Sequence, residues 1–234
     1  MLPAVSFSEV VALAGRFPLL SGLSLEVAAG EVVHLRGPNG AGKTSVLRAC
    51  AGLLPLSAGR AEVLGHDLLL DRQSLRRDVG LLGHAGFLYE ELTVADNLRF
   101  ALRASRSPLE RAAPSLERLG LSGRLLETPV ASCSAGQRRR LALAVLVARA
   151  PQLWLLDEPH AGLDAEARET VDDLVREASA RGTTVLFASH ELERAAVIAD
   201  RVVDVAGGRV VEAPPGVAIA GEGAAAVEVG CDVA

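Results

Sequence analysis

Hydrophobic residues in the first third of the chain either alternate with polar residues or form short runs, and both patterns predict strands. Residues 23–27, Leu-Ser-Leu-Glu-Val, alternate, and residues 31–35, Glu-Val-Val-His-Leu, form a β-rich run. Residues 43–53 instead place their apolar side chains on one face of a helix. A further short strand is predicted at residues 79–82.

The pattern between residues 93 and 150 is helical. Thr93 and Asp96 resemble a capping box, which predicts that a helix begins here. A second helix is predicted from residue 108 to about residue 120, and a third from about 135 to 149.

Strands return after Pro151. Two apolar runs at residues 153–156 and 183–187 flank a helix that is predicted at about 165–181. Strands that are apolar throughout are typical of a parallel sheet buried on both faces. The order of elements therefore predicts an α/β fold with a helical block inserted into the sheet-forming part of the chain.

The amino-acid composition limits which classes of binding partner and metal site are expected. Half of the 234 residues are hydrophobic and only 3% are aromatic, so aliphatic side chains must form the core. The formal net charge of −5 gives no basic footprint, and no nucleic-acid partner is expected. The cysteines Cys50, Cys133 and Cys231 are scattered and form no Cys-x-x-Cys pair, so neither a disulfide framework nor a zinc site is expected.

The sequence also bears on location. The longest apolar stretch, residues 141–156, contains Arg149 and Pro151 and is shorter than the ~20 residues of a membrane-spanning helix. The N-terminus lacks the basic start and long apolar run of a secretion signal. We therefore expect a cytoplasmic protein.

The most specific motif is Gly-Pro-Asn-Gly-Ala-Gly-Lys-Thr, which matches the phosphate-loop pattern GxxxxGK[ST] between a predicted strand and a predicted helix. Glycines allow the backbone to wrap around phosphates, and the helix N-terminus faces the anion. Lys43 would neutralise phosphate oxygens, and the Thr44 hydroxyl would bind Mg²⁺. The predicted nucleotide contacts are Gly37, Pro38, Asn39, Gly40, Ala41, Gly42, Lys43 and Thr44.

A second motif places two carboxylates after an apolar strand. Residues 153–156 are followed by Asp157 and Glu158, at the end of a strand where α/β proteins bind their ligands. Asp157 can hold Mg²⁺, directly or through water, and Glu158 can orient and deprotonate an attacking water. Together with the phosphate loop, this motif predicts hydrolysis of a nucleotide.

The segment from Ser134 to Gln137 resembles the LSGGQ signature of ABC ATPases. Cys133 stands in place of the usual leucine and Ala135 in place of the first glycine. In that family the signature completes the ATP site of the opposite subunit. The resemblance therefore implies that Ser134, Gly136 and Gln137 contact ATP bound by a partner chain.

Two shorter segments fit the same family. Ala-Gly-Leu-Asp at residues 161–164 resembles the D-loop, which couples the two sites across the dimer and here includes Asp164. Ser-His-Glu at residues 189–191 follows an apolar strand and resembles the segment of the switch histidine. The resemblance implies that His190 contacts the γ-phosphate and the attacking water.

Other charged and histidine residues are predicted to have no part in the chemistry. The arginine run at residues 138–140 predicts an exposed helix face, because charge runs are usually solvated. His160 is predicted to be a loop residue, and no role is predicted for His34 or His66.

The resemblance implies one ABC ATPase domain over residues 1–212, with a mostly parallel core sheet and N-terminal antiparallel strands. Its core would comprise about 1–83 and 151–212, and a helical subdomain would span about 84–150. Residues 213–234 are rich in Pro, Gly and Ala and are expected to be disordered. The family further implies ATP and Mg²⁺ as cofactors, a second ATP-binding domain in a homodimer, and an integral-membrane transporter subunit at the cytoplasmic face of the cell membrane.

Two positions of this sequence differ from most members of the family, and both are similar to one branch of it. His84 stands where most members have a glutamine that contacts Mg²⁺ and the attacking water, so it is a third candidate catalytic residue beside Glu158 and His190. Leu-Gly-His at residues 82–84, Glu-Leu-Thr at residues 91–93 and the Ser-Ala-Gly-Gln signature are similar to the ATP-binding subunit of the haem exporter of cytochrome c maturation. The alternatives are an ATPase of another exporter, for drugs, lipids or polysaccharides, or a non-transport ABC ATPase.

The other unusual position concerns the base. Most members stack an aromatic residue on adenine near the N-terminus, and Ala14 aligns with that residue here. Either the site holds its nucleotide mainly through the phosphates, or Phe17 or Arg16 covers the adenine instead.

Overall fold

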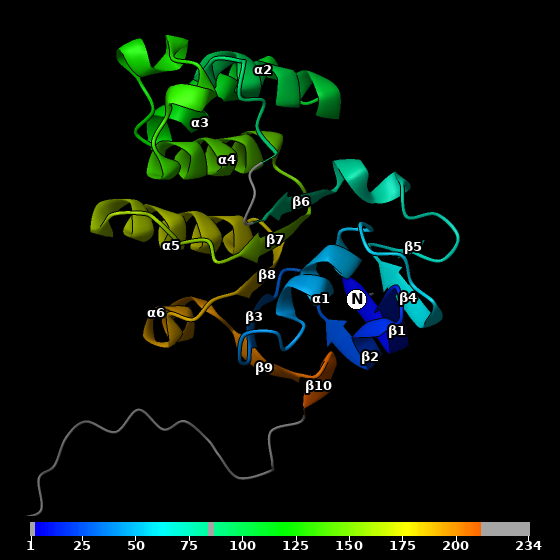
Figure 1. The fold of residues 1–234 in the computed structure, drawn as a ribbon. Coiled ribbons are helices and arrows are strands. Elements are labelled where there is room, and N and C mark those ends of the chain that lie inside the picture. The colour runs from blue at the N-terminus through cyan, green and yellow to red at the C-terminus, as the bar shows by residue number, and fades with distance from the viewer. Residues whose placement is uncertain (1–2, 84–86, 212–234) are drawn as a thin grey trace, which may run out of the picture.

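The computed structural model describes residues 3–83 and 87–211 (Figure 1). The predicted His84 and the predicted disordered segment 213–234 lie outside the described residues. The strands are β1 (Val5–Ala14), β2 (Phe17–Val27), β3 (Val32–Arg36), β4 (Ala58–Val63), β5 (His66–Asp67), β6 (Val79–Leu82), β7 (Leu153–Asp157), β8 (Thr184–Ala188), β9 (Arg201–Ala206) and β10 (Arg209–Val211). The α-helices are α1 (Lys43–Cys50), α2 (Val94–Ser105), α3 (Ala112–Arg118), α4 (Ala135–Arg149), α5 (Ala165–Ala180) and α6 (Leu192–Ile198). Short 3-10 helices lie at Ser74–Arg77, Leu109–Arg111, Gly123–Glu127 and Val130–Ser132.

The described strands form two sheets. The larger has the order β10-β9-β3-β8-β7-β6, and its pairs from β9 to β6 are parallel, while β10 is antiparallel to β9. The smaller sheet has the order β2-β1-β4-β5 and is antiparallel. The predicted fold class, a mostly parallel sheet with N-terminal antiparallel strands, is therefore confirmed.

The larger sheet separates two hydrophobic cores. One core joins the small sheet and α1 to one face of the large sheet, and the other joins α2 to α6 to the opposite face. Figure 1 shows this arrangement, with α2, α3 and α4 in the layer furthest from α1. Helix α1, which follows the phosphate loop, and helix α4, which follows the signature, thus lie on opposite sides of the sheet.

Strand β7 shows why the sequence builds two cores. All of its residues are buried, as its continuous apolar run predicts. Because side chains alternate between the faces of a strand, Leu153 and Leu155 enter the core of α1 while Trp154 and Leu156 enter the core of the other helices.

The predicted helices are largely confirmed. Helix α4 spans the predicted residues, and the Thr93 side chain accepts a hydrogen bond from the Asp96 backbone N–H at the start of α2. The predicted end of the first helix at residue 53 is wrong, because α1 stops at Cys50. Gly52 then takes a left-handed φ of 67° and lies so close to the Arg72 carbonyl that a Cβ would be 2.7 Å from its oxygen.

No helix within residues 3–83 or 87–211 combines the length and the apolar character needed to cross a bilayer. Cys50 and Cys133 are buried free thiols, while Cys231 lies outside the described residues. Burial raises the pKa of Cys50 to about 12, so this thiol stays protonated at neutral pH.

Candidate active site

The phosphate loop, residues 37–42, joins β3 to α1. Gly42 has a φ of 108°, and a Cβ at this residue would lie 3.1 Å from the Cα of Gly208, so the position requires glycine. Gly40 also has a positive φ, and no atom of the described residues lies within 4 Å of where its Cβ would be. The first turn of α1 has no side-chain cap and no acidic residue, which leaves its N–H groups and the helix dipole open to an anion.

Lys43 and Thr44 occupy the first turn of α1. The Lys43 ammonium donates to the carbonyl oxygens of Gly37 and Pro38, at 2.6 and 3.0 Å, within its own loop. The Thr44 hydroxyl donates to Asp157 Oδ2 at 2.8 Å. The hydroxyl and carboxylate predicted to hold Mg²⁺ therefore meet, and two such oxygen donors fit this hard cation.

Glu158 and His190 form a second pair beside these groups. Glu158 Oε2 lies 2.8 Å from His190 Nδ1 and 3.4 Å from the His190 backbone nitrogen. The Glu158 backbone N–H donates to the Ala188 carbonyl at the end of β8. Glu158 has a φ of 51°, a left-handed conformation that costs a non-glycine residue of the order of 1–3 kcal/mol and is concentrated at functional sites.

Arg139 fixes the backbone of the residues that carry these carboxylates. Its guanidinium donates to the carbonyl of Asp157 at 2.7 Å, to that of Gly83 at 2.8 Å, and to that of Glu158. Burial lowers the pKa of Arg139, although both carboxylates favour its charge. The prediction of an exposed face for residues 138–140 is therefore wrong at Arg139, because the free carbonyls at the ends of β6 and β7 take up its donors.

The signature residues begin helix α4. Ser134 Oγ accepts from the Gln137 backbone N–H at 3.2 Å, and Gln137 Oε1 accepts from the Ser134 N–H at 2.8 Å, which completes a capping box. Gly136 lies against the D-loop, since a Cβ on it would be 3.1 Å from the Gly162 carbonyl oxygen. The Ser-x-x-Gln spacing could have predicted this cap from the sequence.

A sequence profile of the family described as "ABC transporter" matches residues 20–161, which is more than half of the chain. The chain belongs to the ABC transporter family. Among curated relatives, it is 43% identical to "Daunorubicin resistance ATP-binding protein DrrA3" of Streptomyces coeruleorubidus, over 82% of this chain and 62% of the relative. It is 41% identical to "Cytochrome c biogenesis ATP-binding export protein CcmA" of Bordetella bronchiseptica, over 75% of this chain and 77% of the relative.

The chain spans less than two thirds of the length of several of these relatives, and only 58% of a "Sulfate/thiosulfate import ATP-binding protein CysA" of Mesorhizobium japonicum. Among solved structures, "Structure of ATP binding subunit of ABC transporter" superposes with a TM-score of 0.82 at 28% identity, over 88% of each chain. A dimeric structure of the ATP-binding cassette MJ0796 "bound to ADP and Pi" has a TM-score of 0.81 at 25% identity, over 88% of this chain and 96% of that one. The fold of this chain is that of an ABC ATPase.

The predicted site residues fall into two groups in this cassette. The phosphate loop, Thr44, Asp157, Glu158 and His190 lie together, since they follow β3, β7 and β8, which are neighbours in the sheet. The signature residues lie at the start of α4, on the far side of the sheet from α1. Asp164 caps α5 by accepting a hydrogen bond from the Ala167 N–H at 2.9 Å.

Sequence reasoning missed two buried histidines. His34, on β3, is 2% exposed; its Nε2 donates to the Ser189 carbonyl at 3.0 Å, and its ring stacks on Phe187. His160 is also 2% exposed, and its Nε2 lies 2.8 Å from Asp172 Oδ1. A histidine within a strand of otherwise apolar residues was a usable signal for His34, but nothing local in the sequence marks the partner of His160.

These two histidines predict how stability depends on pH. Burial lowers the pKa of both below the usual 6.5, and at His34 it outweighs the attraction of Glu158 and Asp204. The unfolded chain therefore binds protons at a higher pH than the folded chain. The free energy of unfolding is therefore at its full value above pH 6.5. As the pH falls from 6.5 towards the lowered pKa values, each histidine reduces this free energy by at most about 1.4 kcal/mol per pH unit.

Urea unfolding at about pH 7.5 and about pH 5.5 measures this loss. His34→Gln keeps a donor for the Ser189 carbonyl but cannot titrate, so we expect it to lose less stability on acidification than the unmodified chain. An equal loss in both chains would contradict the assignment to His34.

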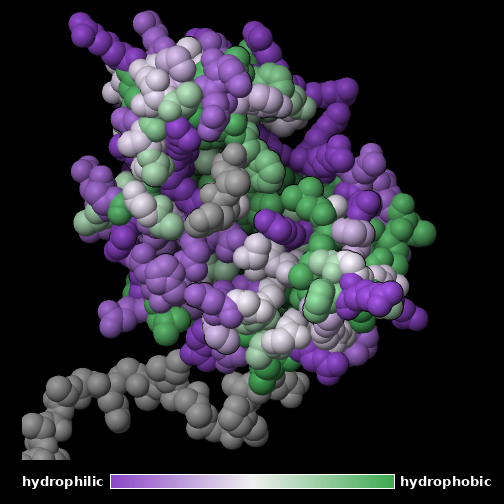
Figure 2. Space-filling model, in the orientation of Figure 1, coloured by the Kyte–Doolittle hydropathy of each residue, from purple (hydrophilic) through white to green (hydrophobic). Residues whose placement is uncertain are grey.

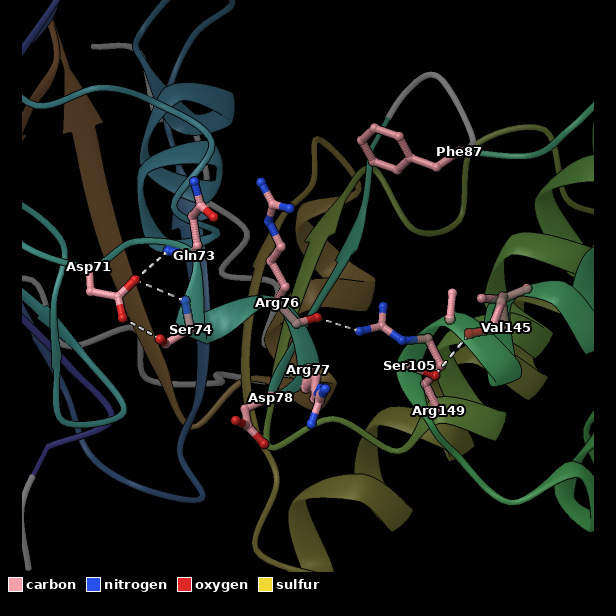
Figure 3. A pocket seen from close by; sticks show the side chains of 12 residues that line it. Asp71, Gln73, Ser74, Arg76, Arg77, Asp78, Phe87, Ser105, Val145 and Arg149 are labelled. Carbon is pink, nitrogen blue, oxygen red and sulfur yellow. Dashed lines mark hydrogen bonds between the residues drawn. The ribbon is translucent and has the colours of Figure 1, made fainter.

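A groove lies between the 3-10 helix Ser74–Arg77 and helices α2 and α4 (Figure 3). Arg76, Arg77 and Arg149 line it, together with Phe87, which is 72% exposed. Within residues 3–83 and 87–211, none of these arginines pairs with a carboxylate: Asp71 accepts from Gln73 and Ser74, Asp78 accepts from Gln152, and Arg149 donates to the Arg76 and Val79 carbonyls. The groove therefore combines positive charge with an exposed aromatic ring.

Proposed function

We propose that this cassette binds Mg·ATP and hydrolyses it. The observation that carries the proposal is that β3, β8 and β7 are neighbours in the sheet. The phosphate loop follows β3, His190 follows β8, and the Asp157–Glu158 pair lies at the end of β7, so these groups lie side by side at one edge of the sheet. Ligands of open α/β sheets bind outside the carboxyl ends of the strands. The measurement is phosphate release with ATP, with and without Mg²⁺; no release with Mg·ATP, alone or with the membrane subunit, would refute hydrolysis.

Each group has a distinct part in this chemistry. The open N–H groups of α1 and the Lys43 ammonium bind the phosphates, for which Lys43 leaves the carbonyls of its own loop. Thr44 and Asp157 would hold Mg²⁺, which neutralises charge that develops on the phosphates. Glu158 Oε2 accepts a proton from the attacking water, and His190 orients the Glu158 carboxylate through the 2.8 Å contact.

We further propose that two cassettes pair head to tail around their nucleotides. Each ATP would lie between the phosphate loop of one chain and Ser134, Gly136 and Gln137 of the other. The placement of α1 and α4 on opposite faces of the sheet supports this pairing, because one chain then presents the two halves of a site in different directions. The dimeric structure of the MJ0796 cassette, at 25% identity, also supports it.

The adenine base is proposed to rest on Phe17. Its ring is 78% exposed, and Ala14 is its partner across the β1–β2 hairpin. Leu19 is on the same face of β2 as Phe17, and its carbonyl oxygen would lie 3.4 Å from a Cβ on Gly42 of the phosphate loop. Phe17 therefore projects from a strand that touches the loop, whereas the small Ala14 side chain offers no surface for stacking.

Removal of the Phe17 ring is expected to weaken ATP binding by about tenfold, since stacking on a base is worth ~1–3 kcal/mol. Ala14→Tyr should change the affinity little. Binding of inorganic tripolyphosphate, which has no base, is the control and should be equal in Phe17→Ala and the unmodified chain. Tighter ATP binding by Ala14→Tyr, with no effect of Phe17→Ala, would place the base against Ala14 instead.

The groove of Figure 3 is proposed to dock an acidic segment of an integral-membrane transporter subunit at the cytoplasmic face of the membrane. The unpaired charges of Arg76, Arg77 and Arg149 would attract carboxylates, and Phe87 would contact an apolar side chain. Figure 2 shows hydrophobic side chains gathered near β5, whereas the side chains over α5 are mostly hydrophilic. Leu70, which is 86% exposed after β5, extends this apolar surface.

Charge reversal in the groove tests this partner. Arg77→Glu is expected to weaken binding to membrane vesicles that contain the transporter subunit by about tenfold, because a charge pair becomes a repulsion. Arg124→Glu, an equal change at an exposed residue of the 3-10 helix Gly123–Glu127 outside the groove, should bind like the unmodified chain. Equal losses in both variants, or equal binding to vesicles without the subunit, would contradict the proposal.

For the transported substrate we propose the haem-export and cytochrome c maturation branch. The Leu-Gly-His and Ser-Ala-Gly-Gln segments support it, as does the similarity to CcmA over 77% of its length. Drug export is the second candidate, supported by the 43% identity to DrrA3. A deletion strain that loses its c-type cytochromes and regains them with this gene, but not with Lys43→Ala, supports the first; unchanged cytochromes with new drug sensitivity support the second.

A further inference from the structure

His160 connects the loop of Glu158 to helix α5. It stands two residues after Glu158, and its buried Nε2 lies 2.8 Å from Oδ1 of Asp172 on α5. The carboxylate accepts, so the Nε2 atom carries the hydrogen. The other ring nitrogen, Nδ1, is buried and has no hydrogen-bond partner in the described part of the chain.

Asp172 extends this contact to the segment of His190. Its second oxygen accepts a hydrogen bond from Arg194 on α6. Arg194 Nε in turn lies 3.7 Å from Oε2 of Glu191, the residue next to His190. Asp172 itself has a side chain that is only 9% exposed.

A second path closes the network. Arg168, also on α5, places Nη1 3.5 Å from the same oxygen of Glu191 and donates from Nε to the Leu163 carbonyl at 3.0 Å. Leu163 precedes Asp164 in the D-loop segment. The network therefore contacts His160 and Leu163 on one side and Glu191, the neighbour of His190, on the other.

Stability alone does not account for such an arrangement. Burial of a charged pair often costs as much as the pairing returns, and apolar residues of similar volume are frequently as stable. The unpartnered Nδ1 of His160 adds a further cost. The hydrogen bonds and ion pairs of this network fix the relative positions of the two loops. Apolar packing would fix these positions less precisely.

We propose that Asp172 is a positioning residue. Through His160 and Arg194 it holds the loops of Glu158 and His190 in the relative position that hydrolysis requires. The Glu158 N–H bond to the Ala188 carbonyl joins the starts of the two loops, and the 2.8 Å contact between Glu158 and His190 depends on the position of both. The inference rests on the proposed ATP hydrolysis and adds to it a residue that touches neither the nucleotide nor the water.

Asp172→Asn tests the inference, with Asp173→Asn as its matched control. Asp173 is the next residue on the same helix, but its side chain is 54% exposed and pairs with Arg176. We expect Asp172→Asn to lower kcat by about 10–100-fold, the size of effect that a small misplacement of catalytic groups produces. ATP affinity should be unchanged, because the phosphate loop is untouched, and Asp173→Asn should keep full activity.

Two variants of His160 separate positioning from folding. His160→Gln keeps a donor for Asp172 and should retain most activity, whereas His160→Leu removes the donor and should lose kcat even when it is measured well below the melting temperature of this variant, where it is fully folded. Equal kcat in Asp172→Asn and Asp173→Asn, or activity that follows the melting temperature through all variants, would overturn the positioning role alone. An unmodified chain that hydrolyses no ATP would overturn the proposed function and this inference with it.

Discussion

Glu158→Gln is expected to lower the rate of ATP hydrolysis by about 10²–10⁴-fold, the usual contribution of a positioned general base. The amide keeps the shape of the side chain but cannot accept a proton from water. ATP binding should survive, because the phosphate loop and the Thr44–Asp157 pair are unchanged. Phosphate release and nucleotide affinity, both measured on the purified variant, check the two halves of this expectation.

Glu117→Gln supplies the control for charge, since Glu117 is an exposed residue of α3 and does not belong to the strand ends. This variant should hydrolyse ATP at the rate of the unmodified chain. Near-normal hydrolysis by Glu158→Gln would remove Glu158 from the chemistry and leave the strand ends without an assigned base.

Lys43→Ala and Ser134→Asp should each abolish most activity, for different reasons. The first removes a charged hydrogen bond to the phosphates, which is worth ~1.5–3 kcal/mol, so ATP affinity should fall by about 10–100-fold. The second keeps the cap of α4, because aspartate caps as well as serine, but it places a carboxylate where the partner's γ-phosphate is proposed to lie. We expect a loss of about 10²-fold in kcat, as for removal of one transition-state donor.

The control for Ser134→Asp is Ser132→Asp, an equal change at an exposed residue of the Val130–Ser132 helix that is outside the signature. It should leave hydrolysis unaltered. Circular dichroism and melting temperature should be equal for both aspartate variants. Full activity in Ser134→Asp would exclude the signature from the site.

The sequence predicted those features that local patterns determine. Helix α4 and strand β7 lie where periodicity and apolar runs placed them, and the fold class followed from their order. The phosphate loop could be found because its glycines, Lys43 and Thr44 are contiguous. The meeting of Thr44 with Asp157 was predictable in outline, because both follow buried parallel strands.

Contacts between distant segments were not predictable. Arg139 looked like one of three exposed arginines, because its partners are backbone carbonyls, which every residue has. His160 and Asp172 are separated by a turn and half of a helix, and only the packing of α5 on the sheet brings them together. The early end of α1 at Cys50 could have been predicted, because glycine just after a helix is a common stop signal, but the close approach of Arg72 to Gly52 could not.

The central claim is that two chains complete each other's ATP sites, and mixing two inactive variants tests it most directly. Lys43→Ala has an intact signature, and Ser134→Asp has an intact phosphate loop. If they pair head to tail, each mixed dimer has one complete site, and an equal mixture should regain about a quarter of the unmodified activity when the two sites work independently. A mixture as inactive as its separate components, although the chains pair, would contradict the shared site.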